Sequence, residues 1–179
     1  MSIRNSLLSL LAEGDRHGYQ LRQEFEARTG GAWPVNIGQV YTTLGRLVRD
    51  GLAEEVGRQD DGSVTYRITP TGKAEVETWW SHPVPRSAPE RDEASIKVAL
   101  AVASPGVDAL GVIETQREEV LRALTTWTRD KARLPERPDG ADLARLLVLD
   151  QQIFAAEAEA RWLDHCEQRL ALTTTGGTR

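Results

Sequence analysis

The segment that most constrains the fold is residues 36–69, in which a capped amphipathic helix is followed directly by a hairpin pattern. Asn36 can cap the helix, with Gln39 at the third position of a capping box, and Gly51 can end it in the left-handed conformation. Between the caps, four apolar residues recur at the spacing of a buried helical stripe: Val40, Leu44, Leu47 and Val48. Alternating apolar and polar residues around Asp61-Gly62 then predict two paired strands.

Two further helices are predicted before this segment and one after it. Ser2 can cap a first helix that stops near Gly14. A second helix covers about 17–29, with its apolar residues expected inward: Tyr19, Leu21 and Phe25. Thr69-Pro70 has the cap and first-turn proline of a fourth helix. Three helices followed by a two-stranded ribbon is the order of a winged helix-turn-helix domain.

The remainder of the chain is predicted to be helical. The segment 81–91 holds three prolines and is typical of a linker. Helical patterns follow at about 92–104, 107–134 and 141–172. The sequence therefore predicts a mainly α protein with this organisation: a winged helix-turn-helix domain at 1–80, a linker at 81–91, an all-helical dimerisation domain at 92–172 and a disordered tail at 173–179.

The last predicted helix carries a long apolar seam. Its members recur mostly three and four residues apart: Leu146, Leu149, Ile153, Ala156, Ala160, Leu163 and Leu170. Such a seam resembles a coiled-coil surface and predicts pairing with a second copy of the chain. The alternative is burial against the chain's own segment 107–134, and both can hold at once.

Composition narrows the classes of protein. The formal net charge is −5 and neither half of the chain is basic, so a nucleic-acid contact would need a local patch. A single cysteine, Cys166, predicts a cytoplasmic protein without an internal disulfide. No apolar run is long enough to span a membrane. No metal-ligand set, cofactor fingerprint or catalytic motif is found, so no metal, no cofactor and no enzyme activity are predicted.

The polar side of the 36–51 helix is a candidate reading surface for DNA. No acidic residue occurs between Asn36 and Arg49, and the residues expected to face solvent are Asn36, Gln39, Thr42, Thr43, Arg46 and Arg49. Asparagine and glutamine suit adenine, arginine suits guanine or phosphate, and threonine suits phosphate or the thymine methyl group. Tyr41, at the border, could donate its hydroxyl to a phosphate. The alternatives are a winged helix that docks a protein and a solvated face without a partner.

Residues 17–72 also resemble the PadR family of bacterial transcriptional regulators. The matching stretches are HGYQL (17–21), GGAWPVNIGQVYTTLGRLVRDGLAEE (30–55) and TYRITPTGK (65–73). The helical part, 92–172, resembles the longer members, whose C-terminal helices build the dimer. The resemblance implies a homodimeric repressor of an inverted repeat in double-stranded DNA. It places DNA contacts at Tyr19, Asn36, Gly38, Gln39, Tyr41, Thr42, Thr43 and Arg46.

The tip of the wing departs from the family pattern. Many relatives carry a Lys/Arg cluster there, whereas this chain has Gln59-Asp60-Asp61-Gly62-Ser63. Two carboxylates would repel phosphate. The wing contact is therefore expected either to shift to Arg58 and Arg67 or to be weak.

Four of the five tryptophans are candidates for an effector site. Relatives respond to phenolic acids or planar hydrophobic drugs, so the resemblance implies a small hydrophobic or aromatic effector. A pocket between the DNA-binding domain and the dimerisation domain would be lined by Trp79, Trp80, Trp127 and Trp162. The alternative is that these rings simply fill helix interfaces.

Overall fold

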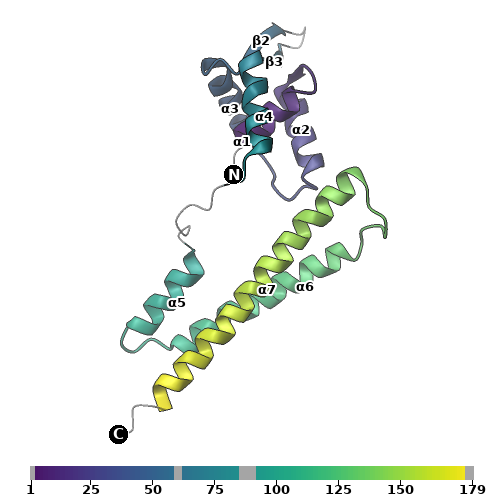
Figure 1. Cartoon of the computed structure of the whole chain (residues 1–179). Coiled ribbons are helices and arrows are strands. Elements are labelled where there is room, and N and C mark those ends of the chain that lie inside the picture. The colour runs from purple at the N-terminus through teal and green to yellow at the C-terminus, as the bar shows by residue number, and fades with distance from the viewer. Residues whose placement is uncertain (1–2, 59–61, 85–91, 176–179) are drawn as a thin grey trace. The chain divides into compact units, whose positions relative to one another are not determined.

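The computed structural model describes residues 3–58, 62–84 and 92–175, and it divides into two compact units (Figure 1). One unit comprises residues 1–85 with 139–145, and the other comprises 86–138 with 146–179. We call the described part of 3–84 the winged-helix unit and the described parts of 92–138 and 146–175 the helical unit.

The winged-helix unit has the predicted order of elements and one strand that the sequence pattern missed. Its elements are α1 (Ile3–Leu11), β1 (Arg16–His17), α2 (Gly18–Arg28), α3 (Ile37–Arg49), β2 (Ala53–Arg58), β3 (Val64–Ile68) and α4 (Pro70–Ser81). The missed strand β1 pairs antiparallel with β3, giving a three-stranded sheet in the order β1-β3-β2. Two residues are too few to show an alternating pattern, so sequence periodicity could not reveal it.

The helix ends form largely as their cap residues dictate. The Asn36 side chain accepts a hydrogen bond from the Gly38 amide at 2.8 Å, so the capping box expected from Gln39 is not the cap that α3 uses. At the other end, Gly51 has φ of 73° and the Leu52 amide donates to the Leu47 carbonyl at 2.9 Å. This is the Schellman arrangement that lets the chain turn from α3 directly into β2.

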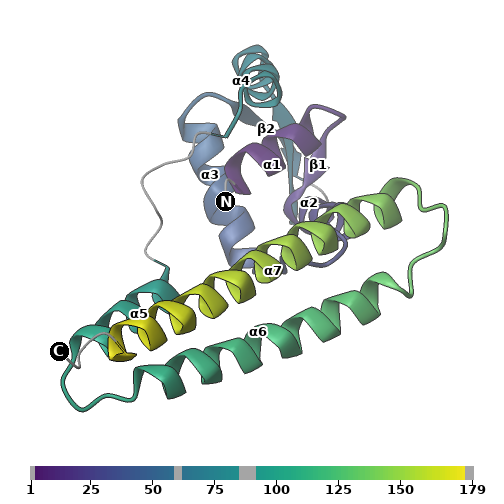
Figure 2. The ribbon, with the colours of Figure 1, turned by 60° about the horizontal axis from the view of Figure 1, so that its bottom comes forward.

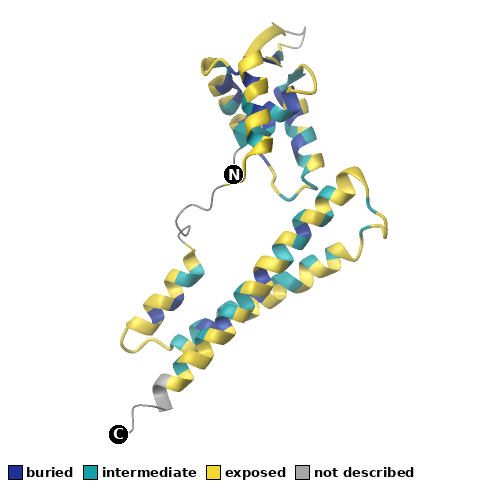
Figure 3. Ribbon diagram, viewed as in Figure 1, coloured by how far each residue is buried: buried dark blue, intermediate teal, exposed yellow. Residues whose placement is uncertain are grey.

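The core of the winged-helix unit gathers apolar residues from all four of its helices and from the sheet (Figure 3). Its fully buried side chains are Leu7, Leu8, Leu11, Leu21, Val40, Leu44 and Leu47. Helix α2 buries Leu21 and Phe25, which lie four residues apart on one face, but Tyr19 is 51% exposed. The expectation that Tyr19 points inward was wrong, because a residue two positions from Leu21 lies on the opposite side of the helix.

The helical unit contains α5 (Glu93–Ala103), α6 (Ala109–Lys131) and most of α7 (Gly140–Thr175). Helices α6 and α7 run antiparallel side by side (Figure 2), linked by Arg117 to Asp164 at 2.9 Å and Lys131 to Asp150 at 2.5 Å. The core that α6 and α7 share with α5 is formed by Val98 of α5, Ile113 and Val120 of α6, and Ala156 and Leu163 of α7. Helix α7 continues to Thr175, into the segment expected to be disordered, and 176–179 lie outside the described residues. None of the described helices is long and apolar enough to cross a membrane.

Candidate nucleic-acid interface

Helix α3 separates a buried apolar side from an exposed polar side. Val40, Leu44 and Leu47 are completely buried in the core. The residues that the sequence assigned to DNA contact lie on the other side or along its borders: Asn36, Gly38, Gln39, Tyr41, Thr42 and Arg46 are exposed, and Thr43 is half-buried. The structure therefore brings these seven residues together on one helix.

Arg46 is the cation on this face that keeps its donors available. Within the described part of the chain no carboxylate pairs with it, whereas the neighbouring Arg49 reaches Asp50 at 3.3 Å. A guanidinium carries five N–H donors in a planar fork, which matches either the edge of guanine or a phosphate. Arg46 is therefore the residue of α3 best suited to a bidentate contact.

A groove of about 930 Å³ runs beside this face, and we call it the α3 groove. Gln39, Thr43 and Arg46 form its α3 wall. The opposite side comes from the start of α1 and the end of α4, and it includes Arg4, Asn5, Ser6, Glu75, Trp79 and His82. Arg4 donates to Glu75 at 2.9 Å, so this second cation at the groove is already paired.

The hydroxyl groups of the two threonines of α3 both donate hydrogen bonds within the helix. Thr42 donates to the Gly38 carbonyl and Thr43 to the Gln39 carbonyl, each at 2.8 Å. In this arrangement neither hydroxyl has a hydrogen left to donate to a phosphate oxygen. The methyl groups remain, so contact with the thymine methyl is the role that these two side chains can fill.

Two glycines at this surface have different reasons to be glycine. A Cβ atom on Gly18 would lie 2.7 Å from Cε1 of Tyr41, so the absent side chain lets the Tyr41 ring lie over the first turn of α2. A Cβ atom on Gly38 would meet only the Asn36 side chain, at 3.3 Å. Packing thus explains why residue 18 is glycine. Glycine at position 38 instead leaves the backbone at the start of α3 accessible to a binding partner.

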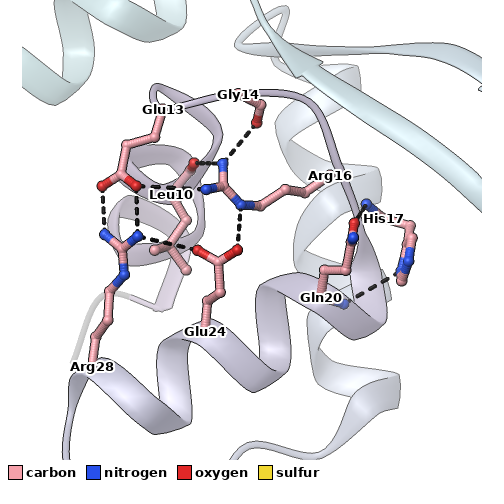
Figure 4. A network of polar contacts seen from close by, with 8 residues as sticks. All are labelled: Leu10, Glu13, Gly14, Arg16, His17, Gln20, Glu24 and Arg28. Carbon is pink, nitrogen blue, oxygen red and sulfur yellow. Dashed lines mark hydrogen bonds and ion pairs between the residues drawn. The ribbon is translucent and has the colours of Figure 1, made fainter. Parts of the chain in front are cut away.

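A polar network fixes the turn that joins α1 to α2 (Figure 4). Arg16, whose side chain is 16% exposed, donates to the Leu10 carbonyl and to Glu24, both at 2.6 Å. Arg28 binds Glu13 through both terminal nitrogens at 2.5 and 2.6 Å. The hydrogen bonds from Arg28 hold the pKa of Glu13 below its usual value. These contacts set the position of α2, and with it the exposed ring of Tyr19.

One of the two cations expected at the wing, Arg67, is paired within the fold. Arg67 on β3 donates to both carboxylate oxygens of Asp15, to Oδ2 at 2.6 Å and to Oδ1 at 3.1 Å, and these hydrogen bonds lower the pKa of Asp15. Arg67 is therefore engaged within the fold. The side chain of Arg58 and residues 59–61 lie outside the described residues. Asp15 and Arg67 are 52 positions apart, so no local sequence signal could have revealed the pair.

The four candidate effector tryptophans fall into two separate groups. Trp79 and Trp80 end α4, with ring centroids 4.4 Å apart and planes tilted by 46°. Trp127 and Trp162 pack against the core of the helical unit. The second pair thus fits the alternative that tryptophan fills helix interfaces.

Much of the predicted dimer seam on α7 packs within its own chain. Leu149, Ala156 and Leu163 are buried. Ala156 and Leu163 belong to the core of the helical unit, and Ala160 and Leu170 pack against that core. Burial against the chain's own segment 107–134 accounts for Ala156, Ala160, Leu163 and Leu170, while Leu146 and Ile153 are half-buried. Cys166 also packs on this core, and burial raises the pKa of its thiol, which disfavours the reactive thiolate.

Comparison with known proteins agrees with this architecture. The model of the "Transcriptional regulator PadR-like family" matches residues 7–78, and that of the "Virulence activator alpha C-term" matches 90–171. The probable transcriptional regulator Rv1176c of Mycobacterium tuberculosis is 28% identical over 187 residues, covering 95% of this chain and 98% of its own. The transcriptional regulator Rv3488 of the same organism is 39% identical over 75 residues, covering 41% of this chain and 67% of its own.

Solved structures share the fold over nearly the whole length. Bacillus subtilis PadR in complex with operator DNA has a TM-score of 0.66 at 21% identity, over 95% of this chain and 97% of that one. The Vibrio cholerae virulence activator AphA has a TM-score of 0.69 at 22% identity, over 96% and 99%. The matched proteins are transcriptional regulators and not enzymes. The chain belongs to the PadR-like family of transcriptional regulators.

Proposed function

We propose that this regulator is a sequence-specific DNA-binding repressor, acting as a homodimer on an inverted repeat and responding to a small hydrophobic or aromatic effector. The observation that carries the proposal is the acid-free outer face of α3, where Arg46 stands without a carboxylate partner among the described residues. Bacillus subtilis PadR, which shares the fold, has been solved with operator DNA and with p-coumaric acid, and this supports both kinds of ligand.

In the proposed mechanism, residues 1–80 read DNA and residues 92–172 hold two copies together. Each copy places α3 in a major groove, and the two grooves lie about one helical turn, roughly 34 Å, apart. Gln39 and Arg46 would read base edges, while Asn36, Tyr19 and Tyr41 would position the helix on the backbone. An effector that changed the spacing or angle of the two α3 helices would release the operator.

The proposed dimer contact lies on the side of α7 that faces away from the intrachain core. Leu147 and Phe154 are 61% and 66% exposed there, and the exposed Leu143 lies one turn before Leu147. Helix α5 adds exposed Ile96 and Leu100, also one turn apart. Large apolar side chains gathered on helix faces mark surfaces that another protein covers.

Fluorescence anisotropy with a labelled duplex from the gene's own upstream region tests the proposal. Wild-type protein should bind tightly and lose affinity steeply as salt rises, because phosphate contacts release counterions. Arg46→Ala should weaken binding to this duplex by about 10- to 100-fold, since a bidentate base contact is worth about 1–3 kcal/mol.

Arg122→Ala, which removes the same charge from α6, should change little and serves as the matched control. Weak binding that is equal on upstream and random duplexes and insensitive to Arg46→Ala would instead favour a winged helix that docks a protein. The paired Arg67 and the acidic wing sequence are the observations that make this the second candidate.

A second measurement addresses the wing. Asp15→Asn should release Arg67 and so add a cation at the base of the ribbon. We expect binding to DNA to strengthen several-fold at low salt, and log affinity to fall more steeply with log salt, by about 0.9 for one added phosphate contact. Asp130→Asn, on α6, removes an equal charge elsewhere and controls for net charge. An unchanged salt slope would show that Arg67 lies beyond reach of the DNA.

A further inference from the structure

The winged-helix unit contains a second cavity, of about 420 Å³, between α1, α2 and α4. We call it the α4 cavity. Leu10, Phe25 and Val76 give it an apolar lining, and Trp79 and Trp80 stand at the end of α4. Ser9, Thr29 and the Glu13–Arg28 pair supply its polar groups. This volume and this mixture, mostly apolar with a few polar groups, are typical of sites for small molecules.

We propose that the α4 cavity binds an uncharged, planar aromatic molecule of one or two rings that carries a hydrogen-bond donor. The site differs from the pocket between domains that the sequence suggested, because every lining residue belongs to the winged-helix unit. Its regulatory consequence rests on the proposed effector response, whereas the binding itself does not.

The aromatic walls argue for a planar ligand. Trp80 is 68% exposed although it lines a cavity, and large aromatic side chains are usually well buried. It is tilted by 46° against Trp79 rather than stacked on it. A flat ring in the cavity would cover the exposed indole surface and add an aromatic contact.

The polar groups argue against a charged ligand. Arg28 and Glu13 neutralise each other through two hydrogen bonds, so an anion would have to displace Glu13 and a cation would have to displace Arg28. Ser9 donates its hydroxyl hydrogen to the Ser6 carbonyl at 2.9 Å, and Thr29 donates to the Phe25 carbonyl at 2.7 Å. Both hydroxyl oxygens can still accept, so they match a donor such as a phenol O–H or a ring N–H.

The α4 cavity is connected to the DNA-reading face through one shared wall. Trp79 and Ser6 line both the α4 cavity and the α3 groove, whose other side holds Gln39 and Arg46. A ligand that shifts Trp79 therefore changes the surface beside the reading helix. We expect occupancy of the α4 cavity to alter DNA affinity without any contact between ligand and DNA.

The indole N–H resonances of the full chain test the proposal by two-dimensional ¹H–¹⁵N NMR. The five tryptophans give five signals, which Trp→Phe variants assign. The probes are 2-naphthol, which is neutral at pH 7, and the matched anion 2-naphthoate. We expect 2-naphthol to shift the Trp79 and Trp80 signals saturably and to bind at least about tenfold more tightly than 2-naphthoate.

Two variants locate the site. Trp80→Ala, at a largely exposed position, should weaken 2-naphthol binding about tenfold through the lost aromatic contact. Trp127→Phe in the helical unit should leave it unchanged. The proposal is overturned if 2-naphthol gives no saturable shift, if 2-naphthoate binds more tightly, or if only the Trp127 and Trp162 signals move. No DNA is needed for this readout, so a chain that binds 2-naphthol but no operator would overturn the DNA-binding proposal alone.

Discussion

Gly72→Ala is expected to destabilise the winged-helix unit by about 3 kcal/mol, at the upper end of the usual cost of overpacking. A Cβ atom at this position would lie 2.1 Å from the Leu52 carbonyl oxygen and 2.8 Å from Cγ1 of Ile68. The carbonyl cannot easily yield, because it accepts the Thr69 amide at 3.0 Å and the Leu52 amide is bonded to Leu47. Glycine at this position allows the first turn of α4 to pack against the chain entering β2.

Urea denaturation followed by circular dichroism measures the effect, and Gly45→Ala is the matched control. Gly45, like Gly72, lies in a helix, but it is exposed and a Cβ atom there would meet nothing within 4 Å. Alanine costs less backbone entropy than glycine inside a helix, so this change should raise stability by roughly 0.5–1 kcal/mol. The two Gly→Ala substitutions should therefore change the free energy of unfolding in opposite directions. A Gly72→Ala protein as stable as wild type would contradict the packing argument.

Features that depend on neighbours in the sequence could be predicted, and features that depend on distant segments could not. Asn36 and Gly51 bounded α3 correctly because caps act within one turn. The strand β1 and the Asp15–Arg67 pair escaped prediction because their partners come from β3, about 50 residues later. For the candidate site this affects the wing, because Asp15 pairs with Arg67, a cation that the sequence analysis had assigned to DNA contact.

The apolar seam of α7 illustrates a different limit. A spacing of three and four residues shows that one side of a helix is buried, but it does not show what buries it. In the structure Ala156 and Leu163 pack on the chain's own core with Ile113 and Val120 of α6. The exposed residues Leu147 and Phe154 lie about half a turn around the helix from that seam, where the sequence analysis had not looked for a partner surface.

Leu147→Glu combined with Phe154→Glu is expected to convert the proposed homodimer into monomers and to reduce operator affinity by about 100-fold or more. Two carboxylates placed in an apolar contact would each lose hydration without gaining a partner. A monomer carries a single α3, so it loses the increase in affinity, about 10²- to 10⁴-fold, that two linked binding modules provide. Light scattering coupled to size-exclusion chromatography gives the mass, and anisotropy gives the affinity.

The matched control places the same two charges farther along the same side of α7, as His165→Glu with Gln168→Glu, where the wild-type side chains are polar and exposed. This variant should remain dimeric and should lose only the small affinity that two added negative charges remove at low salt. Circular dichroism should show unchanged helix content in both variants, because all four positions face solvent within one chain. If the Leu147/Phe154 variant stays dimeric and binds the operator normally, the two copies meet elsewhere, and the exposed Ile96 and Leu100 of α5 become the surface to substitute next.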